Sequence, residues 1–412
     1  MKTSQAATLA VAASLVNAQN STKYSNGTTA VVQLPSEWLY LLPQPFNSSI
    51  RYSWLNSTTT GNETINRALE EANNSRFVSY SDEFTQLVGP TPNISTIQCP
   101  PGAPECAFEA GVWLPDTDEV WFMYLDFDYP YNQSITSFSL RNNSAHQVVT
   151  NPPIRYPLGG YYYSYDGLVY LTEFNATTSP ATIVTVDPKT LKATPILNSY
   201  QGIPLAPCDD VVVTRVNNKD YIFLTTFSIQ DVLGSKFPRQ RYDTAVWRFD
   251  LQEKVLQPVI SANEIVAPNG IRVSPDGRTL YVTNTAITDQ SKLEDQASNT
   301  TKSNSIYEYD LNDQGKPVNG RLYGLVRSGI ANGLHIDNAG RVWTAEDDGI
   351  NVRNAAGRLL GSFNYVPFHK VDQPRIGNFA LAGNKLVIGV DSYVVIYDLA
   401  EKLVTPGNLL TN

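Results

Sequence analysis

The chain has 412 residues, a hydrophobic content of 42% and a formal net charge of −9 at pH 7. This length and apolar content allow a large buried core, and 23 tyrosines against 2 methionines favour a strand-rich interior over packed helices. The acidic balance leaves no basic stripe to neutralise phosphates, which argues against a nucleic-acid partner.

The N-terminal residues have the order of a secretory signal. Lys2 precedes an apolar run that is too short to span a bilayer, and Val16-Asn17-Ala18 forms a small-residue cleavage site. The alternative is a buried N-terminal helix, which this order of charge, apolar run and alanine disfavours. We therefore expect residues 1–18 to be a removed signal peptide, no transmembrane anchor, and a secreted or vesicular protein.

Asn-X-Ser/Thr sequons are frequent and lie mostly in polar, loop-like sequence, which predicts an N-glycosylated chain. Many fall in residues 19–95, a polar segment without sustained period that we expect to wrap the outside of the protein, with one helix around Asn66 to Asn73. The sequons begin at Asn20, Asn26, Asn47, Asn56, Asn62, Asn73, Asn93, Asn132, Asn142, Asn175 and Asn299.

The three cysteines fit an oxidising compartment. Cys99 and Cys106 bracket a short turn-rich loop, which a disulfide could close for roughly 2.5 kcal/mol. Cys208 is then left over as a nucleophile, an intermolecular bridge or a buried small hydrophobe. Because the chain has only 3 histidines to serve as a base, we favour the buried alternative.

From Ala107 onward, a turn followed by a short β-rich strand recurs six times, as in SYDGLVYLTEF and SPDGRTLYVTN. The copies are 44 to 62 residues apart, about the length of a four-stranded blade. A β-sandwich also has closely spaced strands but does not explain a period near fifty. We predict an all-β, six-bladed β-propeller over residues 96–412. The buried markers of the copies are Val120, Val169, Ile222, Leu280, Val342 and Leu386.

Four repeats carry a polar residue just before the innermost strand. These are Glu109 in AFEAGVWLP, Asp209 in LAPCDDVVV, Asn269 in APNGIRV and Asn332 in ANGLHID. Innermost strands of a propeller start at one mouth of the central channel, so the four side chains should meet there. Two carboxylates and two amides form an oxygen-only set suited to Ca²⁺. The alternative is turn capping, most obviously for Asn before Gly.

These segments resemble the SMP-30, gluconolactonase and lactonohydrolase family of propellers, most of all its fungal lactonohydrolase branch. The resemblance runs from about Ser79 to the C-terminus and depends on FEAGVW, DDVVV, APNGIRVSPDGRTLYVTNT and ANGLHIDNAGRVWTAEDDGINV. It implies one divalent ion, usually Ca²⁺, bound by Glu109, Asn269 and the residues at positions 209 and 332. The family has Asn and Asp at those last two positions, where this chain has Asp209 and Asn332.

The exchange at Asn332 bears on catalysis. In hydrolytic family members the Asp at this position activates water or attacks the substrate, and an amide cannot accept that proton. Losing a positioned base lowers a rate by about 10²–10⁴, so Asp209 or His335 would have to substitute. Strand alternation points His335 to the face opposite Asn332. The sugar-lactone branch also has a substrate-binding Arg where this chain has Pro207, which disfavours a sugar-acid substrate.

Aromatic residues are also candidates for the mouth. Tyrosines after Gly159-Gly160 could line a pocket with hydroxyl donors, with Tyr163 as the candidate catalytic donor; the alternative is that they are blade core. The residues considered are Tyr161, Tyr162, Tyr163, Tyr165, Tyr365, Phe368, His369 and Lys370.

Three functions follow for small-molecule substrates. The first is a non-hydrolytic enzyme of fungal secondary metabolism that orients partners for cyclisation or cycloaddition, since orientation alone contributes about 7 kcal/mol. The resemblance includes hetero-Diels–Alderases that join a tropolone-derived quinone methide to a sesquiterpene. The second is a Ca²⁺-dependent lactonase or esterase, and the third is an inactive secreted binding propeller. We favour the first because Asn332 and Pro207 replace two groups that a sugar lactonase uses. The oligomeric state stays open.

Overall fold

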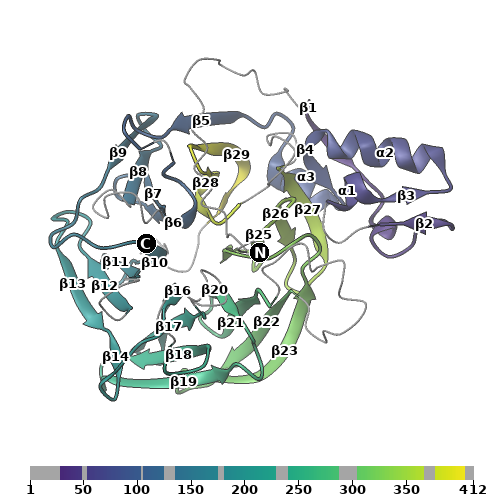
Figure 1. Ribbon diagram of the computed structural model, residues 1–412. Helices are drawn as coiled ribbons and strands as arrows, with labels where there is room; N and C mark the ends of the chain where they lie inside the picture. Colours follow the sequence, from purple (N-terminus) through teal and green to yellow (C-terminus); the bar gives the residue numbers. More distant parts are fainter. Residues whose placement is uncertain are drawn as a thin grey trace, which may run out of the picture.

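The computed structural model describes residues 28–48, 53–103, 105–124, 135–174, 181–228, 240–286, 304–365 and 376–403. Small antiparallel sheets surround a central axis as six blades, which confirms the predicted six-bladed propeller (Figure 1). Several predictions fall outside the described residues and remain predictions. They concern the signal peptide 1–18, Asn20, Asn26, Asn132, Asn175, Asn299, Phe368, His369 and Lys370.

In blades 1 to 4 the strands follow chain order from the axis outwards (Figure 1). Their bounds are β6 (Glu109–Leu114), β7 (Glu119–Met123), β8 (Ile135–Ser139) and β9 (Ser144–Gln147); β10 (Pro157–Tyr163), β11 (Leu168–Glu173), β12 (Thr182–Val186) and β13 (Ala193–Leu197); β16 (Cys208–Val216), β17 (Lys219–Thr226), β18 (Ala245–Asp250) and β19 (Val255–Ser261); β20 (Pro268–Val273), β21 (Thr279–Asn284), β22 (Ser305–Leu311) and β23 (Pro317–Leu325). The hairpin of β14 (Ser199–Tyr200) and β15 (Ile203–Pro204) precedes blade 3.

The N-terminal part of the chain extends blade 5. This blade consists of β24 (Leu334–Ile336), β25 (Val342–Glu346), β26 (Gly349–Arg353) and β27 (Leu359–Asn364), and its sheet continues into β4 (Ser75–Ser79) and β1 (Thr28–Gln33). The junction is aromatic: the Phe77 ring meets Phe363 and Tyr397 edge-on at 5.8 and 5.5 Å between centroids. Such pairs add to the burial energy of large side chains and fix the N-terminal part against the propeller.

Three short helices cover this extension: α1 (Trp54–Ser57), α2 (Glu63–Asn73) and α3 (Asp82–Val88). The remaining N-terminal elements are η1 (Ser36–Leu39), β2 (Phe46–Asn47) and β3 (Thr59–Thr60). The predicted helix starts earlier than expected, because the Asn62 side chain accepts hydrogen bonds from the Thr64 and Ile65 N–H groups and caps α2. No described helix is long and apolar enough to cross a bilayer.

Blade 6 joins the two ends of the chain. Its strands β28 (Phe379–Val390) and β29 (Tyr393–Leu403) are completed by β5 (Ile94–Gln98), which pairs with β29. The predicted disulfide between Cys99 and Cys106 is confirmed and connects this closing strand to the start of blade 1. Cys208 is the free cysteine and is fully buried, as expected. The boundary expected between residues 95 and 96 falls within β5 and stays a prediction.

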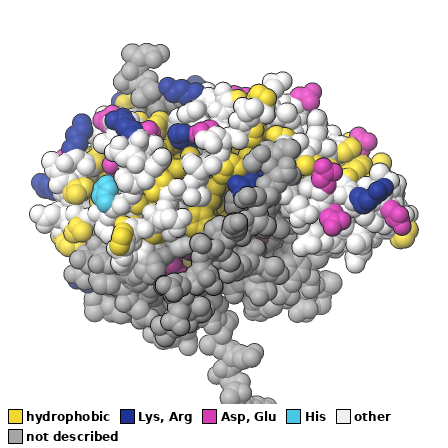
Figure 2. Space-filling model, turned by 90° about the horizontal axis from the view of Figure 1, so that it is seen from above, with side chains coloured by type: hydrophobic (Ala, Val, Ile, Leu, Met, Phe, Trp, Pro, Cys, Tyr) yellow, Lys and Arg dark blue, Asp and Glu magenta, His cyan; other side chains and the backbone are white. Residues whose placement is uncertain are grey.

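The side of the ring seen in Figure 2 carries hydrophobic side chains among uncharged ones, with acidic and basic side chains scattered around them. Most large apolar side chains are instead internal, and the core residues of neighbouring blades merge into shared clusters. Blades packed in this way form one rigid support for groups at the channel.

Replacing both Cys99 and Cys106 by Ser should lower the free energy of unfolding by roughly 2.5 kcal/mol, because the disulfide restricts the unfolded chain. Urea denaturation measures the difference. Dithiothreitol should lower the stability of the wild type by a similar amount and leave the double variant unchanged. Equal stability of the wild type and the double variant under oxidising conditions would show that this bond does not stabilise the closed propeller.

Candidate functional site

The four polar residues predicted for the mouth occupy one ring. Strands β10, β16 and β20 each shift register near their start, which marks the same point in each blade. Aligned on this point, Glu109, Asp209, Asn269 and Asn332 take equivalent positions in blades 1, 3, 4 and 5. All four are half-buried, while the residue after each is buried. Blades 2 and 6 have Leu158 and Gly377 at the position.

At the junctions after blades 2, 4 and 5 the inner strands approach each other so closely that only glycine fits at the residue after the ring position. A Cβ atom added to Gly159 would lie 2.3 Å from the carbonyl oxygen of Asp209, and one added to Gly270 would lie 2.5 Å from that of Asn332. Backbone of one blade therefore contacts backbone of the next. This contact restricts the backbone next to the ring residues.

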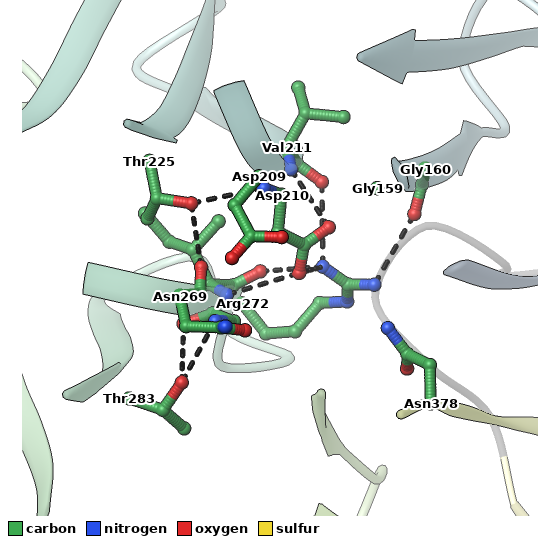
Figure 3. A network of polar contacts seen from close by, with 12 residues as sticks. Gly159, Gly160, Asp209, Asp210, Val211, Thr225, Asn269, Arg272, Thr283 and Asn378 are labelled. Carbon is green, nitrogen blue, oxygen red and sulfur yellow. Dashed lines mark hydrogen bonds and ion pairs between the residues drawn. The ribbon is translucent and has the colours of Figure 1, made fainter. Parts of the chain in front are cut away.

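Threonine hydroxyls connect the blades at the same level. The Thr225 hydroxyl of blade 3 accepts a hydrogen bond from the Asp210 N–H at 3.0 Å and donates one to the Asn269 carbonyl of blade 4 at 2.6 Å (Figure 3). Two other junctions repeat this arrangement. Thr172 bonds the Gly159 N–H at 2.8 Å and the Asp209 carbonyl at 3.0 Å, and Thr283 bonds the Gly270 N–H at 2.8 Å and the Asn332 carbonyl at 3.1 Å.

A buried ion pair lies next to the ring. Arg272 of blade 4 donates to the Asp210 carboxylate of blade 3 at 2.6 Å and to the Gly160 carbonyl of blade 2 at 3.3 Å, so it spans three blades (Figure 3). Both side chains are only 4% exposed. The Asp210 carboxylate also accepts the backbone N–H groups of Val211 and Ile271. Asp210 is thus fully occupied, which leaves Glu109 and Asp209 as the carboxylates of the ring.

These two carboxylates hold protons unusually well. Burial, followed by the charges of Asp209 and Asp210, raises the pKa of Glu109 well above its ordinary value. Burial and the charge of Asp210 raise the pKa of Asp209 to about 7. The described residues contain no group of three or more His, Cys, Asp or Glu that could hold a metal. Two carboxylates with two amides nevertheless fit Ca²⁺, which accepts carboxylate and amide oxygens with water.

His335 lies below the ring. It is buried, its ring packs 4.8 Å from that of Phe379, and it lines a cavity of about 20 Å³ together with Arg272 and Tyr161. Burial and the neighbouring Arg272 charge lower the pKa of His335 well below its ordinary value. An imidazole with so low a pKa is a weak base, which argues against His335 as the group that activates water.

The predicted tyrosines separate: Tyr161 and Tyr162 line the small cavity with His335 and Arg272, whereas Tyr163 does not. The Tyr163 hydroxyl donates to Asp220 at 2.6 Å, and Asp220 pairs with Arg215 near the other end of blade 3. Leu158 holds the ring position of this strand, and a strand rises about 3.3 Å per residue, so Tyr163, five residues further along, lies well beyond the ring. The catalytic role suggested for Tyr163 is therefore wrong: its hydroxyl serves packing at the far end. Tyr365 is buried in the core.

Sequence reasoning missed the ion pair and the threonines, although both left a pattern. Arg272 stands between two apolar residues of a strand, where a charge must find a buried partner. Three repeats have threonine three residues after the buried marker, in LVYLTE, YIFLTT and TLYVTN. A residue type that recurs at one repeat position indicates a recurring contact.

The fold and the ring define a six-bladed propeller with an oxygen-rich candidate site at one mouth of its channel. The chain belongs to the SMP-30/gluconolactonase/LRE-like family, whose sequence model matches residues 109–386. It is 25% identical over 288 residues to lactonohydrolase oryL of Aspergillus oryzae, covering 66% of this chain and 64% of that protein. Lactonohydrolase oryH of the same organism is 24% identical over 318 residues, covering 61% and 66%.

The match therefore spans about two thirds of the length of these relatives. Among solved structures, a gluconolactonase from Xanthomonas campestris is similar with a TM-score of 0.59 and 17% identity, covering 79% of this chain and 95% of that chain. At this identity the similarity establishes the fold alone.

Asp209→Asn should stabilise the cation-free protein at alkaline pH. Folding raises the pKa of Asp209 from 3.8 to about 7. The protonated side chain therefore favours the folded protein fully below about pH 4, and this contribution to the free energy of unfolding is lost as the pH rises through 7. We expect the Asn variant to be more stable by roughly 1–3 kcal/mol at about pH 8, with little difference at about pH 4.

Urea denaturation with a chelator, at both pH values, measures this difference. Asp220→Asn is the matched control. Although burial opposes it, hydrogen bonds from Arg215 and Tyr163 lower the pKa of Asp220, so its removal should destabilise the protein at the higher pH. An Asp209→Asn variant that is less stable than the wild type at about pH 8 would contradict the electrostatic description of the ring.

Proposed function

We propose that this protein is a divalent-cation-dependent hydrolase of small lactones or related esters. The observation that supports the proposal is the shared position of two carboxylates and two amides at the start of four inner strands, with Glu109 and Asp209 close enough to interact and Arg272 matched to Asp210. The names of the two Aspergillus relatives support a lactone as the substrate class.

Glu109, Asp209, Asn269 and Asn332 are the residues that would hold the cation. A divalent ion bound to such a set polarises the carbonyl of an ester and lowers the pKa of water. The structure supports Ca²⁺ over softer ions because all four side chains offer oxygen. Each of the four residues is only half-buried, which supports access by a substrate.

Asp209 is the residue we propose as the base. A carboxylate has two oxygens, so one can bind the cation while the other accepts a proton. Water adds to the lactone carbonyl and gives its proton to Asp209. The ring C–O bond then breaks, and the leaving alkoxide takes that proton to yield a hydroxy acid. Asn332 cannot serve because an amide accepts no proton at neutral pH.

A second candidate is the non-hydrolytic cyclisation or cycloaddition, of the hetero-Diels–Alder type, between a tropolone-derived quinone methide and a sesquiterpene. Asn332 favours it, since an amide donor at the mouth can stabilise a developing oxyanion without a base. The position of Tyr163 weakens it, because the hydroxyl of this tyrosine is bonded to Asp220 and is not available as a donor at the ring.

We also propose that the protein passes through the secretory pathway and is N-glycosylated. The disulfide supports an oxidising compartment. Exposure of five described sequon residues supports glycosylation. They are Asn47, Asn56, Asn62, Asn93 and Asn142.

Turnover of simple γ- and δ-lactones should be abolished by EDTA and restored by Ca²⁺. Glu109→Gln should lower kcat/KM by about 10² or more, because it removes a charged ligand. Asp209→Asn should lower kcat by about 10²–10⁴ as expected for a lost base. Glu119→Gln is the matched control, since Glu119 is equally half-buried at the opposite end of blade 1.

Lactone turnover that is insensitive to EDTA and unchanged in Glu109→Gln would contradict the proposal. A protein that binds Ca²⁺ but is inert toward lactones would favour the second candidate. That candidate is tested by whether the protein accelerates the coupling of an ortho-quinone methide to a macrocyclic sesquiterpene.

A further inference from the structure

We infer that Thr172, Thr225 and Thr283 are positioning residues for the ring, acting through the backbone of the neighbouring blade. The inference deepens the proposed function, because it concerns how the same four side chains are held. Each hydroxyl contacts only main-chain atoms among the hydrogen bonds described above. They are therefore separate from the groups proposed to touch cation or substrate.

The hydrogen bonds fix the direction of each hydroxyl. A threonine hydroxyl has one hydrogen to donate, and the N–H of its own blade takes an acceptor position on the oxygen. At Thr225 that hydrogen points to the Asn269 carbonyl, 2.6 Å away (Figure 3). The side chain is fully buried, so water does not compete for either bond.

Holding the carbonyl of a ring residue holds its side chain. The peptide plane of Asn269 sets the direction of its Cα–Cβ bond, and the glycine next to it leaves the backbone no room to shift. Binding constellations need their groups within about 0.5 Å of the productive geometry. A hydroxyl that fixes the peptide plane therefore contributes to ligand geometry without reaching the channel.

The distribution of the threonines follows the ring donors. Thr172, Thr225 and Thr283 precede the blades that contribute Asp209, Asn269 and Asn332. The repeat position holds Met123 before the blade with Leu158, and Ala345 before the blade with Gly377. At that last junction the Gly333 N–H bonds the Gly377 carbonyl directly at 3.0 Å, without a hydroxyl.

Glu109 is the exception. The position before its blade is Gly389, and the chain just before Glu109 is held by bonds from the Cys106 and Ala107 N–H groups to the Asp391 carbonyl. A purely structural device would be expected at every junction. Its restriction to three of the four donor-bearing junctions points to a role in arranging donors.

The chain supplies a matched control for this inference. Thr226 is as fully buried as Thr225, and its hydroxyl also accepts one backbone N–H and donates to one carbonyl. Both partners of Thr226 belong to Ala245, in the third strand of the same blade. Thr225→Val and Thr226→Val each remove two hydrogen bonds, but only Thr225→Val releases a ring residue.

The first readout is the Kd for Ca²⁺, measured by calorimetry on the full chain alongside urea stability. We expect Thr225→Val to weaken Ca²⁺ binding about 10- to 100-fold, as loss of an outer partner of a ligand does. Thr226→Val should lose comparable stability but change the Kd less than twofold. Thr225→Ser, which keeps the hydroxyl, should bind as the wild type does.

The second readout needs no metal. The side-chain amide NMR signals of Asn269, assigned with Asn269→Ala, should shift in metal-free Thr225→Val and stay in place in Thr226→Val. If the wild type binds no Ca²⁺ but these signals shift, the positioning role stands and the proposed cation site fails. If Thr225→Val changes neither readout, or changes them only as Thr226→Val does, the positioning role is overturned.

Discussion

The close approach of the inner strands at one end of the channel is the constraint on which the site depends. A Cβ atom at Gly159, Gly270 or Gly333 would lie within 2.5 Å of an atom of the next blade. These three junctions have no room for a side chain, whereas Asp210, at the same repeat position in blade 3, places its carboxylate between blades 3 and 4 on Arg272. The donors of the ring stand one residue before these tight contacts, so the backbone that carries them is fixed by how closely the blades join.

The buried charged residues near the ring are of two kinds: Asp210 and Arg272 neutralise each other, whereas Glu109 and Asp209 have like charges. Asp210 and Arg272 are buried and bonded to each other and to backbone, a geometry in which a buried ion pair offsets its desolvation. Glu109 and Asp209 are raised in pKa instead, because burial and like charge oppose their ionisation. Of the two adjacent residues Asp209 and Asp210, Asp210 is therefore bonded to Arg272 and holds the blades together, whereas Asp209 keeps a carboxyl group with a raised pKa in the ring.

Much of the fold could be predicted from the sequence, because it depends on repetition. The recurrence of turn and strand indicated six blades, and the polar residue before each inner strand identified Glu109, Asp209, Asn269 and Asn332. The contacts between blades could not be predicted, since the Arg272–Asp210 pair joins residues 62 apart. Tyr163 was misplaced for a simpler reason: the cluster of tyrosines was treated as one site, although a strand carries its residues from one mouth to the other.

The cost of ionising Glu109 and Asp209 bears on what the ring is for. A carboxylate that is buried near another and has no cation partner destabilises the folded protein at neutral pH, and an amide of nearly equal size would remove that cost. Asn332 shows that an amide fits the ring, yet two positions retain an acid. Stability alone does not explain this choice, whereas a ligand that carries positive charge offsets the repulsion. The ring is thus better described as one half of an electrostatic pair than as a set of turn caps.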